Sequence, residues 1–208
     1  MILWVEFCAL FVVAPVVMAV WVAPENMFLM LFLVTGVGLL LLWRTQGFTW
    51  AQLREGQVTA HWPAVLAIAG GTAVASFVVM FYSDQNGLFG LVRERPHIMV
   101  MIAVLYPLVS ALPQELFFRA LFFNRYRTLF PKRTHIATNA TIFSLAHLMY
   151  WSGTVLVFTV LGGLIFAWAY EKKKSFLLAW VLHSVAGVVL FFFGMGAFFY
   201  SGNVVRPF

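Results

Sequence analysis

The chain has 208 residues, of which 63% are hydrophobic and 10% are charged. A soluble globular domain has roughly 45–50% apolar residues. The higher apolar fraction of this chain, together with its few charges, therefore excludes a water-soluble monomer. Intrinsic disorder and a disulfide scaffold are excluded as well, because the chain has 23 Phe and one Cys. The composition predicts an all-α fold, a polytopic transmembrane helix bundle in which residues 1–208 form a single integral membrane domain.

The hydropathy pattern predicts seven spans, each long enough to cross a bilayer at about 1.5 Å per helical residue. An eighth hydrophobic piece, Ala197–Tyr200, is too short to span alone, so seven to eight membrane helices are expected. Gly70–Gly71 and Gly162–Gly163 indicate close helix contacts, because small residues let backbones approach each other. The predicted spans are Ile2–Val22, Met27–Trp43, Ala64–Tyr82, Ile98–Tyr126, Ile136–Trp151, Thr154–Tyr170 and Ser175–Gly194.

The distribution of cations predicts the topology. Nine of the 13 Lys and Arg residues lie at the end of, or after, the second, fourth and sixth spans. Positive residues concentrate in cytoplasmic loops, so these loops and the N-terminus are predicted to face the cytoplasm. The net charge of +6 therefore reflects membrane orientation and no nucleic-acid partner is expected. The linker Arg44–Pro63 mixes charges with aromatic residues, which favours a position on the cytoplasmic headgroup layer.

Ionisable side chains inside predicted spans are costly and are functional candidates by default. Glu6 is close enough to the N-terminus to reach the interface, so a structural role is expected for it. Glu115, His147 and His183 lie on three different spans, at depths of about 15, 16 and 12 Å by helical rise. Arg119 follows Glu115 by four residues and can form an ion pair with it. A shared polar cavity that opens to water on the cytoplasmic side would explain the common depth.

These residues lie in three short motifs on successive helices. In this pattern the chain resembles the CPBP family of intramembrane proteases, which includes the CAAX prenyl endopeptidases and has the pattern E-E-x-x-x-R, F-x-x-x-H and H-x-x-x-N. The resemblance covers roughly residues 98–200, the expected catalytic core. The motifs here read Gln114-Glu115-Leu116-Phe117-Phe118-Arg119, Phe143-Ser144-Leu145-Ala146-His147 and His183-Ser184-Val185-Ala186-Gly187.

Two positions depart from the family pattern. Gln114 stands where the first Glu, usually assigned to activate water, is expected, and an amide cannot act as a general base. Gly187 stands where an oxyanion-stabilising Asn is expected. One explanation is a variant subfamily that has Gln-Glu in the first motif and a Gly at the end of the H-x-x-x motif. The other explanation is an inactivating Glu→Gln exchange.

The resemblance implies an endopeptidase that hydrolyses a peptide bond with water activated by glutamate and histidine. Hydrolysis needs a base for water, a donor for the oxyanion and an acid for the leaving amine. Glu115 is the candidate base, a poor one if Arg119 holds it tightly, and His147 is expected to share or orient the water. His183 is the candidate oxyanion donor, and the Gln114 NH₂ group is a further candidate for the role of the missing Asn.

The resemblance implies a metal-independent mechanism without a cofactor. Zinc stays open as an alternative, because Glu115, His147 and His183 form a His₂Glu set of the kind that catalytic zinc accepts. The spacing gives that set no support, since no H-E-x-x-H pair is present.

The expected partners are the lipid bilayer and a membrane-associated protein or peptide substrate, in a bacterial or archaeal cytoplasmic membrane. Aromatic stretches at Leu116–Tyr126 and Phe191–Tyr200 are candidate walls for a substrate groove, although an ordinary lipid-facing or packing surface is the favoured explanation. Two other functions stay open. One is a catalytically impaired relative that binds a membrane protein, and the other is a small transporter that uses the His and Glu residues as a proton relay.

Overall fold

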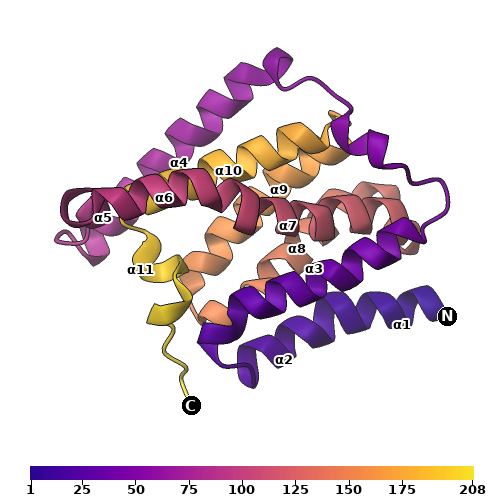
Figure 1. The fold of residues 1–208 in the computed structure, drawn as a ribbon, viewed down its shortest axis with the longest axis horizontal. Coiled ribbons are helices and arrows are strands. Elements are labelled where there is room, and N and C mark those ends of the chain that lie inside the picture. Colours follow the sequence, from indigo (N-terminus) through magenta and orange to yellow (C-terminus); the bar gives the residue numbers. More distant parts are fainter.

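The structure is a computed structural model that describes residues 1–208 as helices joined by short loops, with no strand (Figure 1). Five helical segments are long and apolar enough to cross a membrane, and α10 is a shorter apolar helix. This architecture confirms the predicted polytopic helix bundle. The α-helices are α1 Ile2–Cys8, α2 Ala14–Val20, α3 Met27–Trp43, α4 Trp62–Ser83, α5 Gly90–Glu94, α6 Pro96–Tyr106, α7 Leu112–Glu115, α8 His135–Ala146, α9 Gly153–Glu171, α10 Phe176–Phe192 and α11 Gly196–Phe199.

The loops that carry most of the cations meet at the end of the bundle where the N-terminus lies (Figure 1). Here the guanidinium of Arg125 donates to both carboxylate oxygens of Glu6, at 2.8 and 3.0 Å. The hydroxyl of Tyr126 donates to the same carboxylate at 3.2 Å. Glu6 therefore fastens α1 to the end of the fourth span, in agreement with the structural role expected for it. The side of the membrane that this end faces stays a prediction.

The fifth predicted span, Ile136–Trp151, was too long. Helix α8 has 12 residues, about 18 Å of helical rise, and it ends at Ala146 with His147 as its C-cap. A 3₁₀ turn at Leu148–Tyr150 follows, and Trp151 adopts a left-handed conformation with φ of 49°. The indole N–H of Trp151 donates to the carbonyl oxygen of Ala19 at 3.1 Å, which holds the turn against the end of α2. The early helix end places His147 at a helix terminus inside the bundle.

The fourth span is an α-helix interrupted by wider π-helical turns. Helices α6 and α7 are separated by a π-helical stretch at Pro107–Ala111, and a second one at Leu116–Tyr126 follows α7. Proline has no backbone N–H and so cannot continue the ordinary helical hydrogen bonding. Pro107 begins the first wide stretch, and the short α7 between the two π-helical stretches carries both Gln114 and Glu115. Such π-helical insertions are frequent at functional sites.

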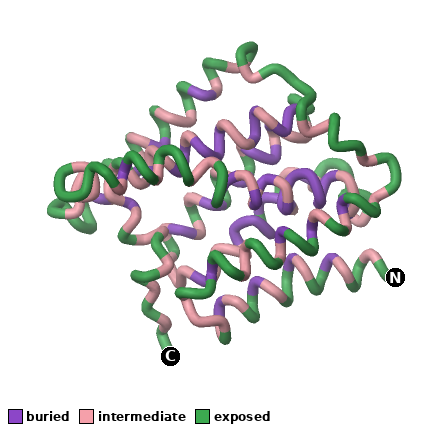
Figure 2. The backbone as a smooth tube through the Cα atoms, viewed as in Figure 1, coloured by how far each residue is buried: buried purple, intermediate pink, exposed green.

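Phenylalanine side chains build the centre of the bundle around the stretch Leu116–Tyr126. Phe117, Phe118, Phe122 and Phe123 are all buried in one cluster of 21 residues that also takes in α1, α8, α9 and α10. Figure 2 shows the contrast between this buried centre and the exposed outer faces of α3, α4 and α6. The aromatic side chains of Leu116–Tyr126 therefore belong to the packed core, which is the ordinary explanation given for them above. The outer faces of the helices present apolar residues to lipid.

Gly163 is the close contact between α8 and α9. A Cβ atom added there would lie 3.0 Å from the Cα of Ala140. We expect Gly163→Leu to force the two helices apart and to lower stability by about 1–3 kcal/mol, the usual cost of overpacking a core. Thermal unfolding of the purified protein in detergent measures this. The matched control is Gly70→Leu, since nothing lies within 4 Å of a Cβ at Gly70. Equal loss of stability in both variants would contradict the assignment.

Candidate active site

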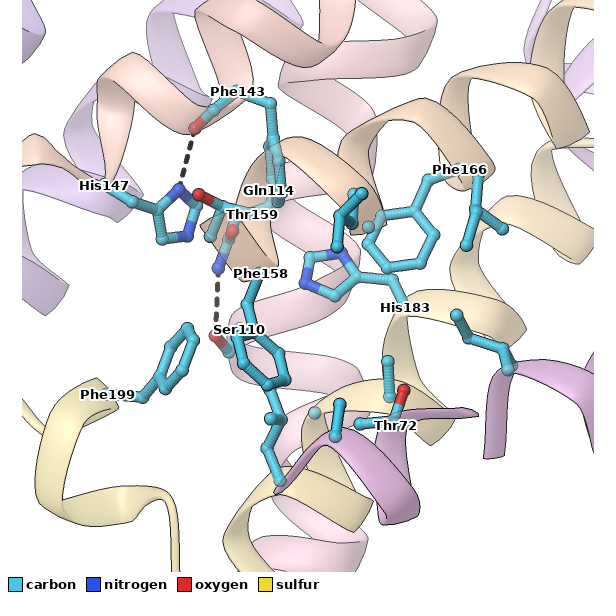
Figure 3. A pocket seen from close by; sticks show the side chains of 18 of the residues that line it. Thr72, Ser110, Gln114, Phe143, His147, Phe158, Thr159, Phe166, His183 and Phe199 are labelled. Atoms are coloured by element: carbon cyan, nitrogen blue, oxygen red, sulfur yellow. Dashed lines mark hydrogen bonds between the residues drawn. The ribbon is translucent and has the colours of Figure 1, made fainter. Parts of the chain in front are cut away.

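A cavity of about 730 Å³ lies between α4, α9, α10 and the junction of α6 and α7. Of the 30 residues that line it, 20 are hydrophobic, so the prediction of a polar cavity was only partly right. The polar groups gather in one region of the wall. Figure 3 shows the side chains of His147, Gln114 and His183 around this region, with Phe158 and Phe199 on another part of the wall.

Most of the side chains that α4 contributes to the cavity wall are small. They include Ala64, Ala67, Gly71 and Ala75, which recur at the spacing of one helix face. The prediction that Gly70 and Gly71 mark a close helix contact was wrong, because a Cβ at either position would meet nothing within 4 Å. Gly71 instead faces the cavity, where it keeps the space open.

His183 is the centre of a chain of polar groups. Its Nδ1 lies 2.8 Å from Oε1 of Glu115, and its Nε2 lies 3.2 Å from the hydroxyl of Tyr106. The ring stacks on Phe166, with centroids 4.7 Å apart and planes inclined by 13°. A carboxylate accepts and does not donate, so Nδ1 carries a proton and donates it to Glu115. Glu115 therefore fixes both the orientation and the tautomer of the His183 ring.

Glu115 itself is fully buried and is absent from the cavity wall. Its second oxygen pairs with Nε of Arg119 at 3.2 Å, and both side chains have 0% exposure. This is the predicted ion pair. A carboxylate held by a guanidinium on one side and an imidazole on the other has no free edge for water, so the geometry does not favour Glu115 as the group that takes a proton from water.

Arg119 is held from its other end by Asn139 of α8. The guanidinium donates to Oδ1 of Asn139 at 2.8 Å, and the amide of Asn139 donates to the carbonyl oxygen of Phe118 at 2.6 Å. The charged group also lies over the ring of Phe143, with 4.6 Å between its central carbon and the ring centroid. A buried charge is tolerated only when it is paired and hydrogen-bonded, and these contacts supply that pairing.

His147 lines the cavity and its ring makes no hydrogen bond to Glu115 or His183. Its Nδ1 lies 2.7 Å from the carbonyl oxygen of Phe143. A carbonyl oxygen only accepts, so Nδ1 donates and the Nε2 atom keeps its lone pair. Figure 3 shows the ring with this bond to Phe143 directed away from the Gln114 amide. The structure thus presents, at the cavity, an imidazole nitrogen able to accept a proton.

Gln114 lies between His147 and His183 in the view of Figure 3. Its NH₂ group donates to the hydroxyl of Ser110 at 3.0 Å, and its Oε1 atom is buried without a partner. The predicted use of the NH₂ group as an oxyanion donor competes with this bond to Ser110. The free oxygen fits the opposite task better, that of accepting a hydrogen bond from water.

Two residues of this network were missed in the sequence. Asn139 is fully buried and supports Arg119, and Tyr106 contacts His183. A search of the apolar spans for amides as well as for ionisable groups would have found Asn139. Tyr106 carried no signal of its own, because it lies inside the predicted span Ile98–Tyr126 of a chain in which 18% of the residues are aromatic.

The same geometry bears on the zinc alternative. Glu115 and His183 contact each other, but nowhere do three His, Cys, Asp or Glu side chains come close enough to hold one metal ion. His147 contacts neither of the other two and turns its Nδ1 to a backbone carbonyl. The His₂Glu set therefore does not fit a zinc ion as these side chains are arranged.

Comparison with known protein families bears on the same segment. Residues 96–189 match the family model described as type II CAAX prenyl endopeptidase Rce1-like. This part of the chain is similar to the CPBP/CAAX protease family. The match begins with α6 and ends within α10 at residue 189. It contains all the polar residues of the network described above, from Tyr106 to His183. No curated protein and no solved structure matches the chain.

Proposed function

We propose that the chain is an intramembrane endopeptidase that hydrolyses a peptide bond of a membrane-associated substrate inside the cavity. The observation that carries this is the pair of imidazoles on one cavity wall. His147 presents a free nitrogen, and His183 is backed by the buried carboxylate of Glu115. A base on one side of the reacting carbonyl and a donor on the other are what peptide hydrolysis requires.

In the proposed reaction His147 is the base. Its Nε2 accepts a proton from water while the free oxygen of Gln114 holds the second water hydrogen. The hydroxide oxygen adds to the carbonyl carbon of the substrate, and the carbonyl oxygen becomes the oxyanion. The C–N bond then breaks, and the proton on His147 passes to the leaving nitrogen. Glu115 and Arg119 act on this reaction through His183, which Glu115 orients.

The proposed substrate is an apolar, membrane-anchored peptide that enters from the bilayer. The walls away from the histidines are apolar and aromatic, and Phe191, Phe199 and Tyr200 of the predicted aromatic wall contribute to them. No part of the cavity offers a cluster of charges for a charged peptide. We place the N-terminus and the cation-rich end in the cytoplasm, in line with the charge distribution.

Gly71→Leu tests whether the cavity receives the substrate. A leucine at this position projects into the cavity and fills part of its volume, whereas Gly70→Leu, one residue earlier, places the same side chain outside it. We expect Gly71→Leu to raise KM about 10-fold or more, since loss of one well-filled apolar subsite costs about 1–3 kcal/mol. Gly70→Leu is expected to leave KM unchanged. Equal KM values in the two variants would exclude this cavity as the binding site.

The activity itself is tested with purified protein in lipid vesicles that hold a library of alkyl-anchored apolar peptides in ¹⁸O-labelled water. Hydrolysis places one ¹⁸O atom in each newly formed carboxylate, which mass spectrometry detects. Cleavage that disappears in His147→Ala supports the proposal. Binding of peptides without any labelled product would instead indicate the catalytically impaired, partner-binding relative.

A further inference from the structure

The side chain of Tyr106 fills the space into which a side chain at position 187 would project. A Cβ atom added to Gly187 would collide with the ring and the hydroxyl of Tyr106. The ring of Tyr106 also packs edge-on against His183, with centroids 6.1 Å apart, and against Phe191 at 5.9 Å. Tyr106 can therefore occupy this position only because residue 187 has no side chain.

The hydroxyl of Tyr106 reaches the same imidazole nitrogen that faces the cavity. It lies 3.2 Å from Nε2 of His183, and both residues line the cavity. Position 187 is one helical turn beyond His183, so a polar side chain there would be directed to the region that the phenol now fills. A polar group thus remains at this place in the wall, although it comes from α6 instead of α10.

We infer that Tyr106 is the oxyanion donor of this site and that Gly187 is the residue that admits it. The inference rests on the proposed peptidase function. When His183 carries protons on both nitrogens, its Nε2–H donates to the oxygen of Tyr106, and Glu115 stabilises the resulting imidazolium. The phenolic O–H is then free to donate to the substrate carbonyl oxygen as that oxygen gains charge.

The proton balance of the reaction is unchanged by this step. Tyr106 keeps its proton and supplies only a hydrogen bond, while the proton removed from water travels through His147 to the leaving nitrogen. A phenol donates one strong hydrogen bond, and removal of one oxyanion donor typically lowers kcat about 10²–10³-fold.

The experiment compares four variants of the chain in lipid vesicles. Tyr106→Phe keeps the ring and removes the donor, so kcat is expected to fall about 10²-fold with KM unchanged. Tyr106→Ala removes ring and donor. Gly187→Asn in the Tyr106→Ala background places an amide in the vacated space, and kcat is expected to rise about 10-fold or more above that of Tyr106→Ala. Gly187→Asn alone is expected to lose activity, because the new side chain collides with Tyr106.

A second readout does not need turnover. Each protein is titrated with alkyl-anchored apolar tetrapeptides in which a phosphonate, a mimic of the tetrahedral oxyanion, replaces one amide, and with the parent amides. Tyr106→Phe is expected to weaken phosphonate binding about 10-fold or more and to leave amide binding unchanged.

If hydrolysis occurs and Tyr106→Phe alters neither kcat nor phosphonate affinity, the inference is overturned and the peptidase function stands. If no variant hydrolyses peptide but phosphonate affinity depends on Tyr106, the oxyanion site stands and the peptidase function fails. If neither hydrolysis nor Tyr106-dependent phosphonate binding is found, both are overturned.

Discussion

Replacement of His147 by alanine is expected to reduce peptide hydrolysis about 10²–10⁴-fold, the usual contribution of a general base. We expect this loss because His147 lines the cavity with a ring nitrogen whose lone pair is free to accept a proton from water. The fold is expected to survive, since the only hydrogen bond of its ring is to the carbonyl oxygen of Phe143. Initial rates and thermal unfolding of the same preparations measure both effects.

The matched control for this change is His97→Ala. His97 is exposed, lies in the first turn of α6 and is absent from the cavity wall. Its replacement should leave both the rate and the unfolding temperature unchanged. A His147→Ala protein that retains full activity would remove the proposed base and, with it, the proposed mechanism.

Arg119→Met is expected to produce the largest loss of stability. It leaves the carboxylate of Glu115 buried with 0% exposure and without its cationic partner, and breaking one member of a buried pair costs about 3–5 kcal/mol. The change also removes the donor to Asn139 and the charge above the Phe143 ring. Thermal unfolding in detergent, followed by circular dichroism, measures the effect.

The double variant Glu115→Gln/Arg119→Met separates charge from packing. Neither remaining side chain carries a charge, so most of the lost stability should return, as is common when a buried ion pair is replaced as a whole. Activity should remain low, because the amide at position 115 of the double variant provides no carboxylate to hold His183. Should the single and the double variant unfold at the same temperature, the buried pair would not be the cause.

The fold was largely predictable because the membrane constrains it so strongly. A span must be apolar and helical, and the hydropathy pattern therefore located the helices from α1 to α10 with the exception of the short α5. It did not reveal where α8 ends, because that end depends on a hydrogen bond between Trp151 and the carbonyl of Ala19, far away in the chain. The π-helical turns around α7 were equally hidden, since the prolines indicate a disturbance but not its form.

The sequence predicted where the candidate side chains lie better than how they contact one another, and their roles stay predictions. Helical rise placed Glu115, His147 and His183 near one depth, and the structure puts Glu115 against His183 and both histidines on one cavity. Depth alone does not say which face of a helix is turned inward, so Glu115 and Gln114 could not be distinguished. Their neighbouring positions on α7 send Gln114 to the cavity and Glu115 to Arg119.

The central claim is that this chain cuts peptide bonds in the membrane. The most direct measurement is quantitative proteomics of protein termini in host membranes that carry the chain, His147→Ala or Gln114→Glu at equal expression. The account predicts new termini with the unmodified chain, their loss in His147→Ala, and more of them in Gln114→Glu, which adds a carboxylate beside the base. Identical termini in all three membranes and in a host without the chain would contradict it.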